Sequence, residues 1–215
     1  AYQYAQEREQ FGKPILNFPG VYEMLANMRA KTDAIRTILY ETARCIDIYK
    51  SIESVSKERS LTPEERQKLK TYQRLADIFT PMLKLFASEY ANQITYDSIQ
   101  VHGGSGFMKD YACERMYRDA RILTIYEGTS QLQVVAAIRG VINGGYLARI
   151  KEYEAIEVKP EFSTMRKVLV SMRERFEQVL ERANSFGSTS EFFDFNSRRL
   201  VEMCGYLLMG HLLVI

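Results

Sequence analysis

Apolar residues recur every three or four positions between residues 21 and 50. This 3.6-residue spacing predicts a long amphipathic helix with one apolar face. At ~1.5 Å per residue, an unbroken helix of that length would measure about 45 Å. The apolar positions of this face are Val21, Met24, Leu25, Met28, Ile35, Ile38, Leu39, Ala43 and Ile46.

A second helix is predicted to begin at Thr62 and Pro63. Thr62 suits the N-cap, proline suits the first helical position, and two glutamates follow in the first turn. The apolar spacing then continues to about Val101, with a kink expected at Pro81. The glycines of "HGGSGF", residues 102–107, are expected to end this helix in a turn.

Two further segments have helical spacing. Residues 2–9 look like the end of another helix, and Thr129 or Ser130 can cap one that runs to about Asn143. No stretch alternates with period two, so we predict an all-α fold, an antiparallel four-helix bundle with additional helices after it. Residues 1–150 are expected to form the bundle, its first helix truncated, and residues 160–215 the incomplete start of a further helical region.

Composition and charge exclude several classes of function. With 46% hydrophobic and 26% charged residues, the 215-residue chain is typical of a soluble globular protein. A net charge of +2 without long like-charged runs argues against nucleic acid as a partner. Three scattered cysteines and two isolated histidines predict neither a disulfide framework nor a metal site, and they fit a reducing compartment.

The two ends of the sequence suggest a piece of a longer protein. The chain opens without a methionine or a targeting peptide and closes on the apolar run "GYLLMGHLLVI". That run is shorter than the ~20 residues of a membrane span, so we expect no transmembrane segment. An interior helix that lacks its partners in this excerpt explains it better than a membrane-surface contact.

Glu127 is the first candidate for chemistry, in "RDARILTIYEGTSQLQ", residues 118–133. A carboxylate that projects from a partly apolar wall would become a stronger base through desolvation. The competing interpretation is an exposed acid just before a helix, favoured by the helix dipole. Physical reasoning about this stretch leaves both interpretations open.

Two more stretches have the same ambiguity. In "QVHGGSGF", residues 100–107, exposed backbone amides could approach a phosphate closely, or the glycines could simply end a helix. In "EREQFGKPI", residues 7–15, Arg8 could contact a phosphate while Phe11 stacks on a ring, or both could be structural. The spacing of the glycines does not match a dinucleotide-binding fingerprint.

Taken together in chain order, residues 7–15, then 100–107, then 118–133, the three stretches resemble the C-terminal helical domain of the acyl-CoA dehydrogenase family, over residues 1–145. The resemblance implies that Glu127 is the base that removes the α-proton of an acyl-CoA thioester while a hydride passes to FAD. It also implies that Gly128 lies beside the substrate. The FAD-contacting residues that it implies are Arg8, Glu9, Gln10, Phe11, Gln100, Gly103, Gly104, Thr129, Ser130 and Gln131.

The same resemblance implies the biological setting. It predicts an oxidoreductase of fatty acid β-oxidation that forms 2,3-enoyl-CoA, passes electrons to an electron-transfer flavoprotein, and assembles as a homodimer or homotetramer. Its location would be cytoplasmic, or the mitochondrial matrix in a eukaryote. The alternatives are an acyl-CoA oxidase and, for the isolated piece, an inactive oligomerisation and cofactor-interface module.

Overall fold

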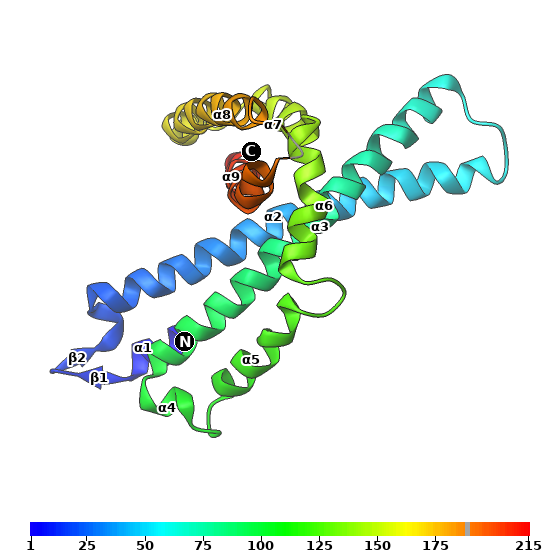
Figure 1. The fold of residues 1–215 in the computed structure, drawn as a ribbon. Helices are drawn as coiled ribbons and strands as arrows, with labels where there is room; N and C mark the ends of the chain where they lie inside the picture. Colours follow the sequence, from blue (N-terminus) through cyan, green and yellow to red (C-terminus); the bar gives the residue numbers. More distant parts are fainter. Residues whose placement is uncertain (188–189) are drawn as a thin grey trace. The chain divides into compact units, whose positions relative to one another are not determined.

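The computed structural model describes residues 1–187 and 190–215, which are almost entirely helical (Figure 1). The strands within these ranges, β1 (Glu9–Gln10) and β2 (Lys13–Pro14), form a single short hairpin. The all-α prediction is therefore confirmed. The helices are α1 (Tyr2–Glu7), α2 (Pro19–Ser56), α3 (Pro63–His102), α4 (Gly104–Phe107), α5 (Ala112–Ala120), α6 (Ser130–Ile142), α7 (Gly145–Glu154), α8 (Ser163–Asn184) and α9 (Glu191–Val214), with 3₁₀ turns η1 (Ile15–Asn17), η2 (Arg121–Thr124) and η3 (Pro160–Phe162).

The start of α3 follows the sequence signal closely. The Thr62 hydroxyl accepts a hydrogen bond from the Glu65 amide at 3.2 Å, and the Glu65 carboxylate accepts one from the Thr62 amide at 2.9 Å. This reciprocal pair is a capping box, which satisfies two amides that the first helical turn leaves without partners. Helix α3 then continues through Pro81.

The end of α3 differs from the prediction in part. The helix does end at His102, and Gly103 has the positive φ of 59° that a turn requires. However, the next four residues form the short helix α4 and not an open loop. A Cβ atom at Gly106 would lie 2.7 Å from the His102 Cβ and 2.8 Å from the Ile99 carbonyl oxygen, so this close approach requires glycine.

Helices α5 and α7 have no counterpart in the predicted elements. Helix α5 is 9 residues long, which is shorter than the window of about 11 residues over which helical periodicity can be recognised. Helix α7 begins immediately after Gly144, whose φ of 73° separates it from α6. None of the helices within the described ranges is both long and apolar enough to cross a membrane.

The chain forms two compact units, each built from two separated stretches. The first unit comprises residues 1–33 and 85–130, and the second comprises residues 34–84 and 131–215. Because these units do not follow sequence order, the predicted boundaries at residues 150 and 160 stay a prediction. In the first unit, the Asn92 side chain ties α3 to the end of α5 by donating to the Ala120 carbonyl at 2.8 Å.

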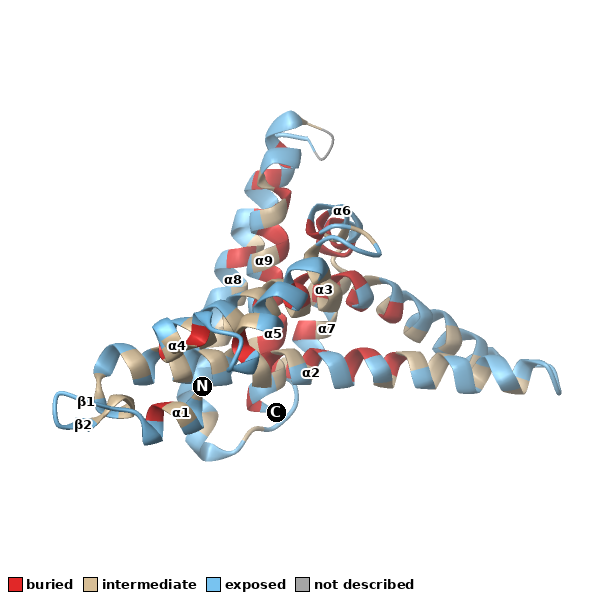
Figure 2. Cartoon of the chain, turned by 90° about the horizontal axis from the view of Figure 1, so that it is seen from below, coloured by how far each residue is buried: buried red, intermediate tan, exposed pale blue. Residues whose placement is uncertain are grey.

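The second unit contains a buried ionic cluster around Glu41, which lies on α2, a helix whose buried positions are red in Figure 2. Its carboxylate accepts hydrogen bonds from Arg44 at 2.7 Å, from Arg149 at 2.8 Å and from the Tyr153 hydroxyl at 2.7 Å. Burial alone would raise the pKa of this carboxyl, but the three hydrogen bonds lower it from 4.5 to about 2. Glu41 is therefore ionised and joins α2 to α7 within this unit.

His211 lies in the same unit, on α9, and is completely buried. Its Nε2 atom is 3.4 Å from a carboxylate oxygen of Glu154. Burial lowers the pKa of the imidazole, and although Glu154 opposes this effect, Arg166 and Arg173 reinforce it. The side chain is therefore neutral near pH 7 and serves as a core residue.

Candidate functional site

The β-hairpin sets the position of the residues predicted around Arg8. Glu9 pairs with Pro14 and Gln10 with Lys13, so Phe11 and Gly12 form the two-residue connection. Both have positive φ values, 50° and 77°, as a type I′ hairpin turn requires. The Phe11 ring is 87% exposed at the tip, with its edge toward Phe18 at 6.3 Å.

Arg8 itself is held by its backbone. Its amide donates to the Tyr4 carbonyl at 2.8 Å, and its carbonyl accepts from the Ile15 amide at 2.8 Å. Its guanidinium is exposed and has no acidic partner within 4.0 Å among the residues that the structure describes. The backbone is thus fixed while the charged end remains available to a ligand.

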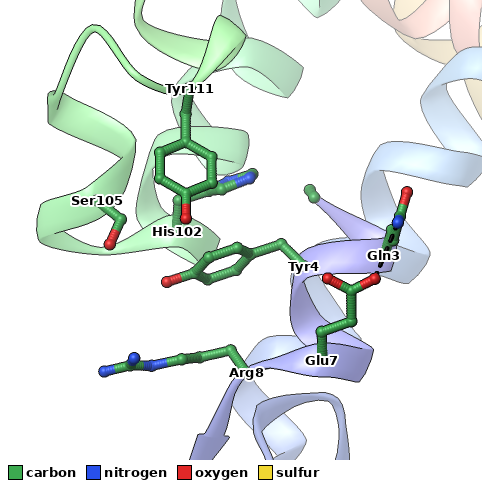
Figure 3. Close-up of a pocket in the computed structure, with 8 residues that line it drawn as sticks. Gln3, Tyr4, Glu7, Arg8, His102, Ser105 and Tyr111 are labelled. Atoms are coloured by element: carbon green, nitrogen blue, oxygen red, sulfur yellow. Dashed lines mark hydrogen bonds between the residues drawn. The ribbon is translucent and has the colours of Figure 1, made fainter.

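The Arg8 side chain lines a pocket of about 510 Å³ in the first unit (Figure 3). Three rings form its other wall: Tyr4 and His102 stack with centroids 4.3 Å apart, and Tyr111 meets the Tyr4 ring edge-on at 5.6 Å. Ser105 from α4 also reaches the pocket. Stacked rings beside a cation suit a ligand that carries a planar ring and a phosphate.

His102 is fixed within this wall. Its Nδ1 atom lies 2.6 Å from the Ser98 carbonyl oxygen, which can only accept a hydrogen bond. Nδ1 therefore carries a proton and donates it to this carbonyl, which fixes the orientation of the ring. The hydrogen bond and the contact with Tyr4 together hold the ring plane.

The structure brings some of the predicted residues together. Gly103 and Gly104 flank the pocket in sequence, between the lining residues His102 and Ser105, and a Cβ atom at either glycine would meet nothing within 4 Å. Gln100 instead lines a second cavity of about 500 Å³, together with Lys109 and Arg118. Glu9, Gln10 and Phe11 are exposed on the hairpin and do not line the Arg8 pocket.

Glu127 lies in the short segment between η2 and α6. It is exposed and has a φ of 50°, and Gly128 follows with a φ of 93°. A non-glycine residue in the left-handed region carries backbone strain, which is common at functional sites. Glu127 does not line the pocket around Arg8.

The residues after Glu127 begin helix α6. Thr129 and Gln131 are exposed, whereas Ser130 is only 8% exposed. The Ser130 hydroxyl has no hydrogen-bond partner among the described residues. A buried hydroxyl without a partner is uncommon in folded proteins, and it is consistent with a ligand that completes this site.

Sequence reasoning missed the aromatic wall. Tyr4, His102 and Tyr111 come from three different elements, and no periodic pattern links them. The only available signal was the position of His102, directly before the glycine turn. The sequence had indicated only that His102 has no metal-ligand neighbours.

Comparison with protein families gives two matches that together span the chain. Residues 1–142 match the family described as acyl-CoA dehydrogenase, C-terminal domain. Residues 142–215 match a second one, described as acyl-CoA dehydrogenase C terminal.

Curated relatives carry several activities. A caffeyl-CoA reductase–Etf complex subunit from Acetobacterium woodii is 40% identical over 133 residues, which cover 62% of this chain and 29% of the relative. A cyclohexane-1-carbonyl-CoA dehydrogenase from Geobacter metallireducens is 34% identical over 140 residues, covering 65% of this chain and 30% of the relative. The chain thus spans less than a third of the length of these two relatives.

A solved structure shares the fold. The crystal structure of an acyl-CoA dehydrogenase from Bacillus anthracis, complexed with FAD, aligns with a TM-score of 0.68 and 27% identity. The alignment covers 96% of this chain and 35% of that protein. The likeness therefore extends over both compact units.

Proposed function

Because the chain belongs to the acyl-CoA dehydrogenase family, we propose that the protein containing it is an FAD-dependent dehydrogenase that converts acyl-CoA thioesters to 2,3-enoyl-CoA. The observation that carries this proposal is Glu127, an acid held with positive φ beside Gly128 at the start of α6. Relatives that oxidise and relatives that reduce CoA thioesters both support redox chemistry at the α and β carbons.

In this proposal Glu127 acts as the base. Its carboxylate removes the α-proton of the thioester, and the electron pair of that C–H bond becomes the new carbon–carbon double bond as a hydride leaves the β-carbon. Gly128 leaves room for the substrate beside the base because it has no side chain. An α-proton is weakly acidic, so the base needs a site from which water is excluded when the substrate is bound.

FAD, when bound, supplies the acceptor for the β-hydride. The residues of this chain fit such a group: Arg8 offers an unpaired guanidinium for a phosphate, and Tyr4 with His102 offers a ring wall. The unpartnered Ser130 hydroxyl, next to Thr129 and Gln131, is a second contact that we assign to the cofactor. We also retain Glu9, Gln10, Phe11, Gln100, Gly103 and Gly104 as proposed FAD contacts.

Replacing Arg8 tests the cofactor contact. Arg8→Ala in the full-length protein is expected to weaken FAD binding by about 10- to 100-fold, because it removes a charge-assisted hydrogen bond worth roughly 1.5–3 kcal/mol. Flavin retained after dialysis, measured by absorbance, gives the affinity. Arg29→Ala is the matched control, since Arg29 is an exposed arginine already paired with Asp33. Equal flavin loss in both variants would exclude this role for Arg8.

A direct assay tests the reaction. Acyl-CoA added to the full-length protein without oxygen is expected to bleach the flavin band and to yield 2,3-enoyl-CoA in equal amount. Reoxidation by electron-transfer flavoprotein, with little peroxide formed under air, would separate a dehydrogenase from the alternative acyl-CoA oxidase. A flavin that no acyl-CoA bleaches, but that an external reductant and an enoyl-CoA reoxidise, would show a reductase instead.

The electron acceptor, the assembly, the metabolic role and the location of the protein are also proposals. We infer that electron-transfer flavoprotein is the electron acceptor, supported by the relative that belongs to a reductase–Etf complex. We further propose a homodimer or homotetramer, a role in fatty acid β-oxidation, and a cytoplasmic or mitochondrial-matrix location. The isolated chain would then be an inactive oligomerisation and cofactor-interface module, and stoichiometric flavin on it would contradict that view.

A further inference from the structure

Helices α8 and α9 lie side by side in the second unit (Figure 2). Their side chains form an apolar groove of about 720 Å³. Leu200 and Ala183 are buried at its base, while Val179, Phe186 and Phe192 are 41–50% exposed along it. The two phenylalanine rings lie 4.5 Å apart. The groove is separate from the pocket around Arg8 and takes no part in the proposed dehydrogenation.

Both helices expose apolar stripes that extend beyond the groove. The exposed apolar positions on α8 and just after its end are three, four or seven residues apart. Arg175 and Arg182 each lie within one of the seven-residue intervals, three residues after an apolar position and four before the next. A stripe with this seven-residue repeat is typical of a helix that packs against another helix. The exposed apolar members are Met165, Val168, Met172 and Val179 on α8, Phe186 just after its end, and Phe192, Met203, Tyr206 and Leu213 on α9.

The charges of the groove have one sign. Arg175, Arg182 and Arg199 line it, and no aspartate or glutamate does so within the part of the chain that the structure describes. None of these arginines has a carboxylate within 4.0 Å among the described residues. Neighbouring arginines differ, because Arg173 pairs with Glu177 at 2.6 Å and Arg198 pairs with Glu202 at 2.8 Å.

Contacts with aromatic rings and one amide hold two of these arginines in place. The Arg182 guanidinium lies 5.8 Å from the centre of the Phe186 ring, and that of Arg199 lies 5.4 Å from the Phe195 ring. Arg199 also donates to the Asn196 side chain at 3.0 Å. The positive charges are thus kept beside the apolar surface, although none of the described residues supplies an anion for them.

We propose that this groove binds an amphipathic helix of a partner protein that carries an apolar stripe flanked by carboxylates. Arg175 and Arg182 are seven residues apart, which is about 10 Å along the helix axis. Carboxylates two turns apart on a docked helix would match that spacing, and its apolar stripe would cover the exposed residues. Two other ligands fit less well. A fatty acid carries a single charge at one end and would leave the other arginines without a partner, and a bilayer surface binds a protruding apolar surface better than a groove.

A designed helix tests the proposal in the full-length protein. The probe is a fluorescently labelled, stapled peptide of about 14 residues, long enough to span roughly 20 Å, with leucines at heptad spacing and flanking glutamates. Fluorescence anisotropy measures its binding in the absence of acyl-CoA, so the result is independent of the proposed dehydrogenase activity. We expect saturable binding that weakens as salt is added.

Charge reversal and a neutral peptide provide the controls. The double variant Arg175→Glu with Arg182→Glu is expected to weaken binding by at least about tenfold. Lys167→Glu reverses one positive charge on α8 outside the groove and should leave binding unchanged; it is compared with each of the single variants Arg175→Glu and Arg182→Glu. A peptide with glutamine in place of each glutamate should bind at least about tenfold more weakly. Circular dichroism confirms that each variant is folded.

Four results would overturn the proposal. The first three are that the neutral peptide binds as tightly as the acidic one, that the double variant binds the acidic peptide as well as the native protein does, and that the acidic peptide shows no saturable binding. The fourth is that the protein binds phosphatidylglycerol vesicles through these arginines in preference to the acidic peptide. Concentration-dependent self-association that blocks the peptide and disappears in the double variant would assign the groove to a second copy of the chain, and would equally contradict a partner helix.

Discussion

Glu127→Gln in the full-length protein is expected to lower the rate constant of dehydrogenation by about 10²- to 10⁴-fold, the usual contribution of a positioned general base. Glutamine keeps the size and the hydrogen-bonding capacity of the side chain but cannot take the α-proton. Rapid mixing with acyl-CoA, followed by the bleaching of the flavin band, measures this step. FAD binding should be unchanged, because Glu127 is proposed to act on the substrate.

Two further variants complete this test. Glu127→Asp keeps the carboxylate but shortens its reach, so it should retain more activity than Glu127→Gln. Glu161→Gln removes another exposed carboxylate far along the sequence and should have no effect. Normal turnover of every acyl-CoA by Glu127→Gln would refute the proposed base.

Glu41→Gln is expected to destabilise the protein by about 3–5 kcal/mol, the usual cost of breaking a buried ion pair from one side. The variant removes the carboxylate that Arg44, Arg149 and Tyr153 share, so the half-buried Arg149 keeps only the exposed Glu152 as an acidic partner among the described residues. Reversible chemical denaturation, followed by circular dichroism, measures the change in the free energy of unfolding. An unchanged unfolding midpoint would contradict the role that we assign to the cluster.

The same residue predicts a pH dependence. Because the pKa of Glu41 falls from 4.5 to about 2 on folding, its contribution is fully present above pH 4.5 and is lost as the pH falls toward 2. A shift of that size corresponds to about 3 kcal/mol. The stability difference between the native protein and Glu41→Gln should therefore shrink across this pH window.

Glu65→Gln is the matched control for this series. The pKa of Glu65 also falls to about 2, through hydrogen bonds from Arg59 and from the Thr62 amide. Glu65, however, lies at the exposed start of α3, where solvent screens the ion pair. Its replacement should therefore change the stability far less than Glu41→Gln.

Local signals predicted much of the fold. The apolar spacing placed α2 and α3 close to their observed bounds, and the Thr62 to Glu65 signature matched a capping box, because both effects depend on residues near one another in sequence. Helix α5 was missed because its 9 residues are too few for helical periodicity to be recognised. The turn after His102 was predicted, but helix α4 was not.

The candidate site could also be predicted only in part. The all-α class, the family and the candidate base Glu127 could be predicted from the order of residues, because helical periodicity and short motifs are local features of a sequence. Packing of the elements was needed to show that Tyr4, His102 and Tyr111 cluster beside Arg8, that Glu41 is buried among Arg44, Arg149 and Tyr153, and that arginines without acidic partners among the described residues line an apolar groove. Each of these depends on side chains from separate elements, and whether a charge is paired, buried or left exposed is settled only when those elements pack.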